Sequence, residues 1–414
     1  MAKKSNSSNH CSFCGRSENE VTLLIAGISG YICDMCAEQA HVIVNETFKG
    51  SEKQPTNFAL ANLPKPKQIK EFLDQYVIGQ DTAKRFLSVA VYNHYKRIMQ
   101  KNIKEDIEIE KSNIILVGPT GTGKTLLAQT IAKMLQVPFT IVDATVFTEA
   151  GYVGEDVESI LTRLLQVADY DVAAAERGIV FIDEIDKIAR KNDNPSITRD
   201  VSGEGVQQGL LKLLEGSIVN VPPQGGRKHP EQRMIAVNTK NILFICGGAF
   251  DGIEKKIAQR LNAHVVGYTA SSNSMHIDRT NLLKYITPMD LKAYGLIPEL
   301  IGRLPILTYL DPLDRDALVR ILTEPKNSII KQYEKLFEMD GITLTFEKNV
   351  FEYVVDKAIE YKVGARGLRS IMEVIMMDAM FVLPSETNKK KMHITLDYAK
   401  KHLEKSEFGK LKVA

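Results

Sequence analysis

The length, composition and charge of the chain limit the classes of protein to which it can belong. With 414 residues the chain is long for one compact domain, so we expect two to four domains. Its 44% hydrophobic and 25% charged residues are typical of globular proteins, and a formal net charge of +2 gives no sign of a nucleic-acid partner. No stretch approaches the roughly 18 apolar residues of a membrane span, and residues 1–10 lack the apolar core of a signal peptide. We therefore expect a cytoplasmic protein with no membrane partner.

Composition separates the chain into four segments. Residues 1–48 hold four of the five cysteines, and residues 49–67 have the polar, proline-containing composition of a linker. Residues 68–310 alternate short apolar strands (113–117, 178–182 and 241–245) with longer helical stretches, which predicts an α/β domain built on a buried parallel sheet. Residues 311–414 contain amphipathic helices and two short β segments, which predicts a smaller, mixed α+β domain.

The four N-terminal cysteines form two C-x-x-C pairs, Cys11/Cys14 and Cys33/Cys36, separated by 18 residues. This spacing is typical of a site in which four thiolates surround one Zn²⁺ ion, and such a site can hold together a segment that has little core of its own. A pair of redox-active dithiols is the alternative, but neither pair lies in a thioredoxin-like βαβ context. The fifth cysteine, Cys246, ends an apolar strand and is expected in the core.

A phosphate-binding loop follows the first predicted strand of the α/β domain. It matches the pattern G-x-x-x-x-G-K-[ST] over Gly118-Pro119-Thr120-Gly121-Thr122-Gly123-Lys124-Thr125, between a strand and a helix, as the motif requires. The glycines let backbone N–H groups point at phosphate oxygens at the positive end of the helix dipole. Lys124 is expected to reach the β- and γ-phosphates of ATP, and the Thr125 hydroxyl to bind Mg²⁺.

Two carboxylates end the next buried strand, at Asp183-Glu184. Because this end of a parallel strand faces the ligand edge of the sheet, Asp183 is placed to hold Mg²⁺ and Glu184 to deprotonate the attacking water. An isolated acidic pair is more often a solvated turn. After a phosphate loop, it indicates ATP hydrolysis.

These features together resemble the ClpX family of AAA+ ATPases over essentially the whole chain. The resemblance implies a zinc module, an AAA+ large domain and a small C-terminal domain in a homohexamer that unfolds proteins. It also implies translocation through an axial pore to the ClpP peptidase, with substrates and adaptors captured by the zinc module. By this resemblance, Tyr152 and Val153 form a pore loop that grips the substrate, and the cationic pore-entrance loop contains Arg227, Lys228 and His229. Arg303 is the arginine finger that acts on the neighbouring subunit, and Arg366 is the sensor-2 arginine. The pair that contacts adenine is Val77 and Ile78.

The chain departs from the family pattern in two places. AAA+ proteins often carry a polar sensor-1 residue at the end of the strand after the hydrolysis motif, but here that strand ends Cys246-Gly247-Gly248, so we assign no such residue. The ClpP-docking tripeptide, usually I-G-F, corresponds to Val266-Gly267-Tyr268. The added tyrosine hydroxyl must be accommodated by an apolar pocket.

Other functions remain open at this stage. A nucleic-acid remodelling ATPase with the zinc module as its contact is one, although the near-neutral charge argues against it. A scaffold that binds ATP without hydrolysing it is another. Among unfoldases, HslU shares the core but lacks this zinc module.

Overall fold

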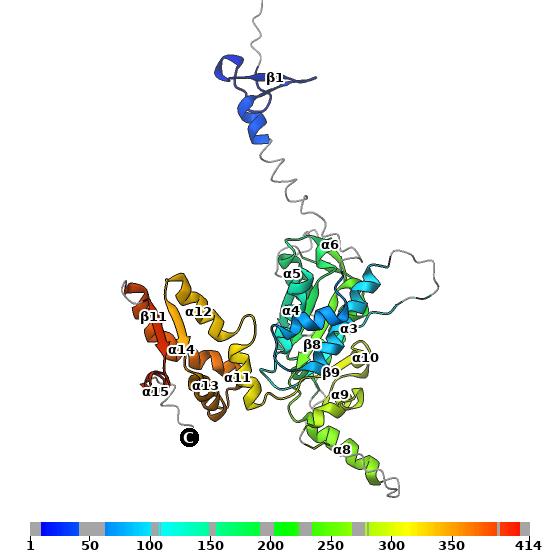
Figure 1. Ribbon diagram of the computed structural model, residues 1–414. Coiled ribbons are helices and arrows are strands. Elements are labelled where there is room, and N and C mark those ends of the chain that lie inside the picture. Colours follow the sequence, from blue (N-terminus) through cyan, green and yellow to red (C-terminus); the bar gives the residue numbers. More distant parts are fainter. Residues whose placement is uncertain are drawn as a thin grey trace, which may run out of the picture. The chain divides into compact units, whose positions relative to one another are not determined.

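The computed structural model describes residues 10–40, 63–100, 107, 109–148, 155–190, 203–222, 234–266, 278–279, 281–386 and 390–405. The chain divides into two compact units, Met1–Asn62 and Leu63–Ala414, and each is described by itself. Figure 1 shows the chain as a ribbon and labels several of the helices and strands. Within the described ranges, no helix combines the length and the apolar character needed to cross a bilayer.

The first unit has very little hydrophobic core. It contains a 3-10 turn, η1 (Glu18–Glu20), and an antiparallel hairpin of β1 (Leu24–Ala26) and β2 (Tyr31–Cys33), and residues 34–40 are helical. Of the residues described in this unit, Cys11 and Cys33 are the two that are buried. Apolar burial therefore contributes little to its stability, as expected for a metal-dependent module.

A parallel five-stranded sheet forms the centre of the second unit. Its spatial order is β4-β5-β8-β3-β9, and each neighbouring pair runs parallel. The register places Asp143 opposite Asp183, and Val117 opposite both Gly248 and Tyr309, so these strand ends share one edge of the sheet. The strands are β3 (Ile114–Val117), β4 (Phe139–Asp143), β5 (Ile179–Asp183), β8 (Leu243–Gly248) and β9 (Ile306–Tyr309).

Helices cover both faces of this sheet. Every residue of β3 and β8 is buried, which explains why these strands are continuously apolar rather than alternating. Helix α4 (Lys124–Leu135) packs against β5, α5 (Ser159–Val167) against β4, and α3 (Asp81–Ile98) against β9. The predicted α/β architecture is confirmed, with strand boundaries at most three residues from those expected.

Shorter elements surround the sheet. An antiparallel hairpin, β6 and β7, follows α7, and a series of helices leads to β9. Their bounds are α2 (Pro66–Asp74), η3 (Ala144–Val146), α6 (Val172–Ala175), η4 (Ile185–Ile188), α7 (Glu204–Glu215), β6 (Ile218–Val221), β7 (Ile235–Asn238), η5 (Thr239–Asn241), α8 (Ile253–Val266), η6 (Leu282–Tyr285), α9 (Pro288–Tyr294) and α10 (Pro298–Gly302).

The C-terminal part of this unit has a hydrophobic core of its own, which includes Phe337, Val354 and Ile375. A parallel pair of strands lies beside its helices, so the predicted mixed α+β character is confirmed. The elements are α11 (Arg315–Thr323), α12 (Ile329–Met339), β10 (Thr343–Phe346), α13 (Lys348–Glu360), α14 (Gly364–Val382), η7 (Leu383–Ser385), β11 (Lys391–Ile394) and α15 (Leu396–Lys405).

Candidate functional site

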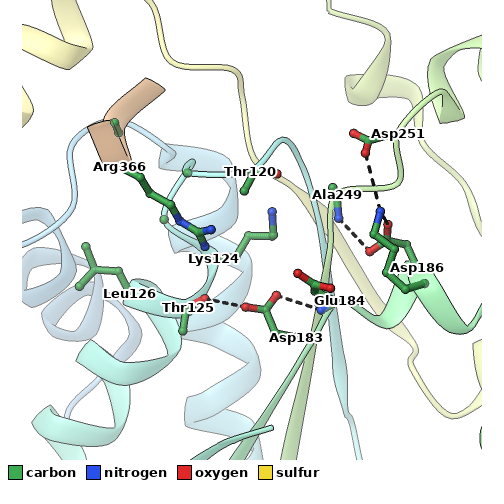
Figure 2. A pocket seen from close by; sticks show the side chains of 14 residues that line it. Thr120, Lys124, Thr125, Leu126, Asp183, Glu184, Asp186, Ala249, Asp251 and Arg366 are labelled. Atoms are coloured by element: carbon green, nitrogen blue, oxygen red, sulfur yellow. Dashed lines mark hydrogen bonds and ion pairs between the residues drawn. The ribbon is translucent and has the colours of Figure 1, made fainter. Parts of the chain in front are cut away.

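A cavity of about 310 Å³ lies at the edge of the sheet where β3, β5 and β8 end. It brings together the predicted phosphate loop, the acidic pair and Arg366, which are far apart in the sequence (Figure 2). The lining residues are Thr120, Gly121, Gly123, Lys124, Thr125, Leu126, Asp183, Glu184, Asp186, Lys187, Ala249, Asp251, Ala365 and Arg366.

The phosphate loop has a backbone that few residues other than glycine could adopt. Gly121 and Gly123 have φ angles of 82° and 99°, in the left-handed region. A Cβ at Gly118 would lie 2.8 Å from the carbonyl oxygen of Leu310, the residue after β9, so there is no room for a side chain at Gly118. Thr122 closes the turn by donating its hydroxyl to the Pro119 carbonyl at 2.8 Å. The loop is followed at once by α4, which begins at Lys124, and the N-terminus of a helix can bind anions.

Lys124 is buried at the base of this loop. Its ammonium donates to the carbonyl oxygens of Gly118 at 2.5 Å and Pro119 at 3.0 Å. Burial lowers the pKa of Lys124, and the nearby carboxylates of Asp183 and Asp186 oppose this effect. The ammonium is thus held against the backbone of the phosphate loop.

Thr125 and the acidic pair meet across the cavity. The Thr125 hydroxyl donates to Asp183 Oδ2 at 3.2 Å, so the two predicted Mg²⁺ ligands lie next to each other (Figure 2). Glu184 is exposed and has a φ angle of 57°, which is unusual for a residue other than glycine. Its N–H donates to Asp183 Oδ1 at 3.0 Å. The left-handed backbone directs Glu184 away from the strand, and such conformations are concentrated at functional sites.

Asp186 is a residue of this site to which we gave no role from the sequence. It is 4% exposed, and its Oδ1 accepts from the Ala249 N–H at 3.1 Å, which connects η4 to the end of β8. Its Oδ2 lies 3.3 Å from Lys187 Nζ, and Asp186 is the largest cause of the raised pKa of Lys187. Its position in the acidic run that begins at Asp183 was the available signal.

The same contacts explain why β8 ends without a polar side chain. A Cβ at Gly247 would lie 2.6 Å from Phe181 Cζ. At Gly248 it would lie 2.7 Å from Asp186 Oδ1 and 2.6 Å from Phe250. A sensor-1 side chain has no room at either glycine, which gives a physical reason for this departure from the AAA+ pattern.

Arg366 comes from α14, whose buried hydrophobic residues belong to the C-terminal core. Figure 2 shows its side chain reaching towards Lys124 and Thr125. Val77 and Ile78 are buried and do not line this cavity; they line a neighbouring one of about 480 Å³. Val77 nevertheless lies next to the phosphate loop, since a Cβ added at Gly123 would be 3.7 Å from its Cγ1.

Arg303 lies on the surface rather than in the cavity of its own chain. Its side chain is 53% exposed, and its Nε and Nη2 donate to Glu215 Oε1 at 3.2 and 3.0 Å. Its carbonyl accepts from the buried Asn113 Nδ2 at 3.0 Å, which positions the backbone. In this arrangement the guanidinium does not reach a nucleotide bound in the cavity of its own chain.

The four N-terminal cysteines converge in the first unit. Their Sγ atoms all lie within 4.8 Å of one another, and those of Cys14 and Cys33 are 3.7 Å apart. A tetrahedron with Zn–S bonds of about 2.3 Å has edges of about 3.8 Å, so the donor set fits zinc. Burial alone would raise the pKa of Cys11, but N–H groups from residues that include Cys14 and Cys33 lower it to about 6. Thiolate formation is therefore favoured at Cys11.

Several predicted residues lie outside the described part of the chain. These are Tyr152, Val153, Arg227, Lys228, His229, Gly267 and Tyr268. Val266 is the last residue of α8.

Three family models match consecutive parts of the chain. The ClpX C4-type zinc finger matches residues 9–46, the AAA domain (Cdc48 subfamily) matches residues 109–307, and the C-terminal, D2-small domain of ClpB matches residues 313–396. The first match contains all four cysteines, and the second contains the phosphate loop and the acidic pair.

Curated relatives are similar over nearly the full length. The protein of Bacteroides thetaiotaomicron is 75% identical over 406 residues, covering 98% of each chain, and that of Bacteroides fragilis is 73% identical over 417 residues, covering 100% of each. Each of these proteins is named the ATP-dependent Clp protease ATP-binding subunit ClpX. The chain belongs to the ClpX family of AAA+ ATPases. A third relative with the same name, from Porphyromonas gingivalis, is 69% identical over 404 residues, covering 97% of this chain and 98% of its own.

Proposed function

We propose that the chain is an ATP-dependent protein unfoldase and translocase that recognises tagged proteins, unfolds them and delivers them to the ClpP peptidase. The observation that carries this proposal is the cavity shared by the phosphate loop, the acidic pair and Arg366. Because Arg366 lies on α14, whose buried hydrophobic residues belong to the C-terminal core, a nucleotide bound there would contact both parts of the ATPase unit. Its binding and hydrolysis can then move one part against the other.

The cavity has the groups that ATP hydrolysis requires. Lys124 would bind the β- and γ-phosphates, and Thr125 and Asp183 would hold Mg²⁺, whose charge stabilises the transferring phosphoryl group. Glu184 would orient and deprotonate the attacking water, and its exposure and left-handed backbone support this role. Val77 and Ile78 would contact the adenine, next to the loop that holds the phosphates.

Arg303 would complete the site of a neighbouring subunit in a homohexamer. This assignment is supported by its exposure and by its absence from the lining of its own cavity. Its partner in this chain, Glu215, is also half-exposed, and such surface ion pairs contribute only about 0–1 kcal/mol. Moving the guanidinium to a γ-phosphate in trans would therefore cost little, and a charge there strongly accelerates phosphoryl transfer.

The remaining assignments couple hydrolysis to a protein substrate. Tyr152 and Val153 would grip the polypeptide in the axial pore, and Arg227, Lys228 and His229 would attract its terminus. The zinc module would recruit substrates and adaptors, and its separation as a compact unit supports such a role. Val266, Gly267 and Tyr268 would dock on ClpP. The proposed location is the cytoplasm.

Degradation of a stably folded, tagged fluorescent protein tests this proposal. We expect loss of fluorescence that requires the chain and Mg·ATP, and peptide products that additionally require ClpP. A catalytically inactive ClpP serves as the control, because it should permit unfolding without peptide release. ATPase activity stimulated by DNA and unaffected by unfolded protein would reject the proposal and favour a nucleic-acid remodelling ATPase.

A further inference from the structure

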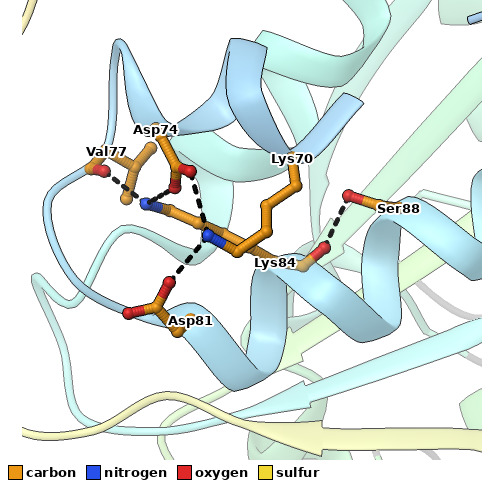
Figure 3. A network of polar contacts seen from close by, with 6 residues as sticks. All are labelled: Lys70, Asp74, Val77, Asp81, Lys84 and Ser88. Carbon is orange, nitrogen blue, oxygen red and sulfur yellow. Dashed lines mark hydrogen bonds and ion pairs between the residues drawn. The ribbon is translucent and has the colours of Figure 1, made fainter. Parts of the chain in front are cut away.

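Lys84 is a buried cation that none of the roles above uses. Its side chain is 3% exposed, and its ammonium donates to Asp74 Oδ1 at 2.7 Å and to the Val77 carbonyl oxygen at 2.6 Å (Figure 3). A buried ammonium is costly unless charged and polar groups replace its water shell. Here the Asp74 carboxylate and the Val77 carbonyl replace that water, and Val77 is one of the two residues proposed to contact adenine.

The chain between these partners reverses direction sharply. Helix α2 ends at Asp74, and α3 begins at Asp81 after two consecutive left-handed residues, Gly79 and Gln80, with φ angles of 66° and 61°. Lys84 lies in the first turn of α3, and its side chain extends back over this reversal, as helical side chains point towards the N-terminus. Lys84 therefore connects the start of α3 with the end of α2 and with the backbone of the turn.

Asp74 is shared between two lysines with different surroundings. Lys70 Nζ lies 2.9 Å from Asp74 Oδ2 and 2.8 Å from Asp81 Oδ1, and its side chain is 29% exposed. Burial alone would raise the pKa of Asp74, but the hydrogen bonds from Lys84 and Lys70 outweigh this effect and lower it. Asp74 thus keeps a cationic partner if either lysine is removed. Of these two lysines, Lys84 is the one whose side chain bonds the Val77 carbonyl.

Two further contacts attach the turn to the rest of the ATPase unit. The Lys326 N–H donates to the Gln75 carbonyl at 2.8 Å. The Gln80 side chain both donates to the Asp311 carbonyl and accepts from the Asp311 N–H, each at 2.8 Å. Residues before and after Val77 are therefore held by the chain that follows β9, while Val77 itself is held by Lys84.

We propose that Lys84 is a positioning residue for adenine recognition: by holding the Val77 carbonyl, it fixes the adenine-contacting segment relative to the phosphate loop. The inference rests on the proposed assignment of Val77 and Ile78. Val77 lies next to Gly123 of that loop, so a displacement of the turn would change the distance between the base site and the phosphate site. Lys84 also lines the cavity that Val77 and Ile78 line, but its ammonium is already bonded to Asp74 and to the Val77 carbonyl, so it would act through the backbone.

Replacing Lys84 with methionine removes the ammonium while keeping an unbranched apolar chain, and Lys70→Met is the matched control. The control removes the other cation from Asp74 but leaves the bond to Val77. In the full-length hexamer with Mg·ATP, we expect Lys84→Met to raise the KM for ATP roughly tenfold or more with kcat changed less than about twofold. Lys70→Met should change both constants less than about twofold.

Inorganic tripolyphosphate, used as a competitive inhibitor of the ATPase, separates positioning from general damage. It has no base, so its inhibition constant should be the same in wild type and Lys84→Met. Equal weakening of ATP and tripolyphosphate, or an unchanged KM for ATP, would overturn the inference. If Lys84→Met does not assemble, Lys84→Arg decides, because a guanidinium can still donate to both acceptors. It should give a smaller rise in KM, again without an effect on tripolyphosphate.

Ile78→Ala distinguishes failure of this inference from failure of the adenine assignment itself. If Ile78→Ala raises the KM for ATP and Lys84→Met does not, Lys84 has no positioning role and the adenine assignment stands. If neither variant changes the KM for ATP, the adenine assignment fails and the inference fails with it.

Discussion

Substituting alanine at Gly248 places a methyl group where two buried side chains already lie. The added Cβ would be 2.6 Å from Phe250 Cε2 and 2.7 Å from Asp186 Oδ1, whereas ordinary van der Waals contacts are 3.4–4 Å. Neither neighbour can withdraw easily, because Phe250 is fully buried and Asp186 is held by the Ala249 N–H and Lys187. The substitution therefore tests whether the end of β8 lacks a side chain for steric reasons.

Overpacking of this kind costs about 1–3 kcal/mol. At about 2–4 °C per kcal/mol, we expect the Tm of the ATPase unit to fall by roughly 2–12 °C in thermal unfolding followed by circular dichroism. ATPase activity should fall as well, since Asp186 and Ala249 line the cavity. Gly302→Ala is the control for stability, because nothing lies within 4 Å of its added Cβ, and its Tm should match wild type. A Tm for Gly248→Ala equal to that of this control would refute the steric explanation.

Three other perturbations test separate parts of the account. Glu184→Gln keeps the size of the side chain but cannot accept a proton, so kcat for ATP hydrolysis should fall roughly 100-fold or more while ATP still binds; retained turnover would exclude Glu184 as the base. Removal of zinc by a chelator should unfold the first unit, which has little core, and spare basal ATPase activity; parallel loss of both would show that the two compact units are not independent. Burial, with the nearby Arg97 and Lys111, lowers the pKa of His94 from 6.5 to about 3. Between these two pKa values the unfolded chain binds one more proton than the folded chain. The contribution of His94 to the free energy of unfolding should therefore be fully present above pH 6.5, and it should fall by about 1.4 kcal/mol per pH unit from pH 6.5 down to about pH 3. His94→Gln should remove this component in denaturant titrations at pH 5 and pH 7, and an unchanged pH dependence would contradict the assignment.

The features that sequence reasoning predicted are those encoded locally. The phosphate loop requires glycines and a lysine within eight residues, and the zinc site requires two short cysteine pairs, so each motif is legible without knowledge of the fold. The meeting of Thr125 with Asp183 followed from one general rule, that parallel strands present their ends at the same edge of a sheet.

The features that were missed depend on contacts between distant segments. Asp186 acquires its role because β8 lies next to β5, although about 60 residues separate them in the chain. The pairing of Arg303 with Glu215 similarly requires α7 and the end of α10 to be neighbours. Lys84 looks like an ordinary lysine in the first turn of an amphipathic helix until the packing of α2 on α3 buries it. Periodicity alone places these side chains on a face and does not identify the partner.

The central claim is that ATP hydrolysis in this chain pulls on a polypeptide, and Tyr152→Ala tests it most directly. ATPase activity and the unfolding of a tagged fluorescent protein should be measured on the same preparation of the variant and of wild type, without a peptidase. Wild type should perform both reactions, and the variant should keep most of its hydrolysis and lose unfolding, because the nucleotide site is intact and the grip is removed. Unfolding by the variant at the wild-type rate would contradict the account.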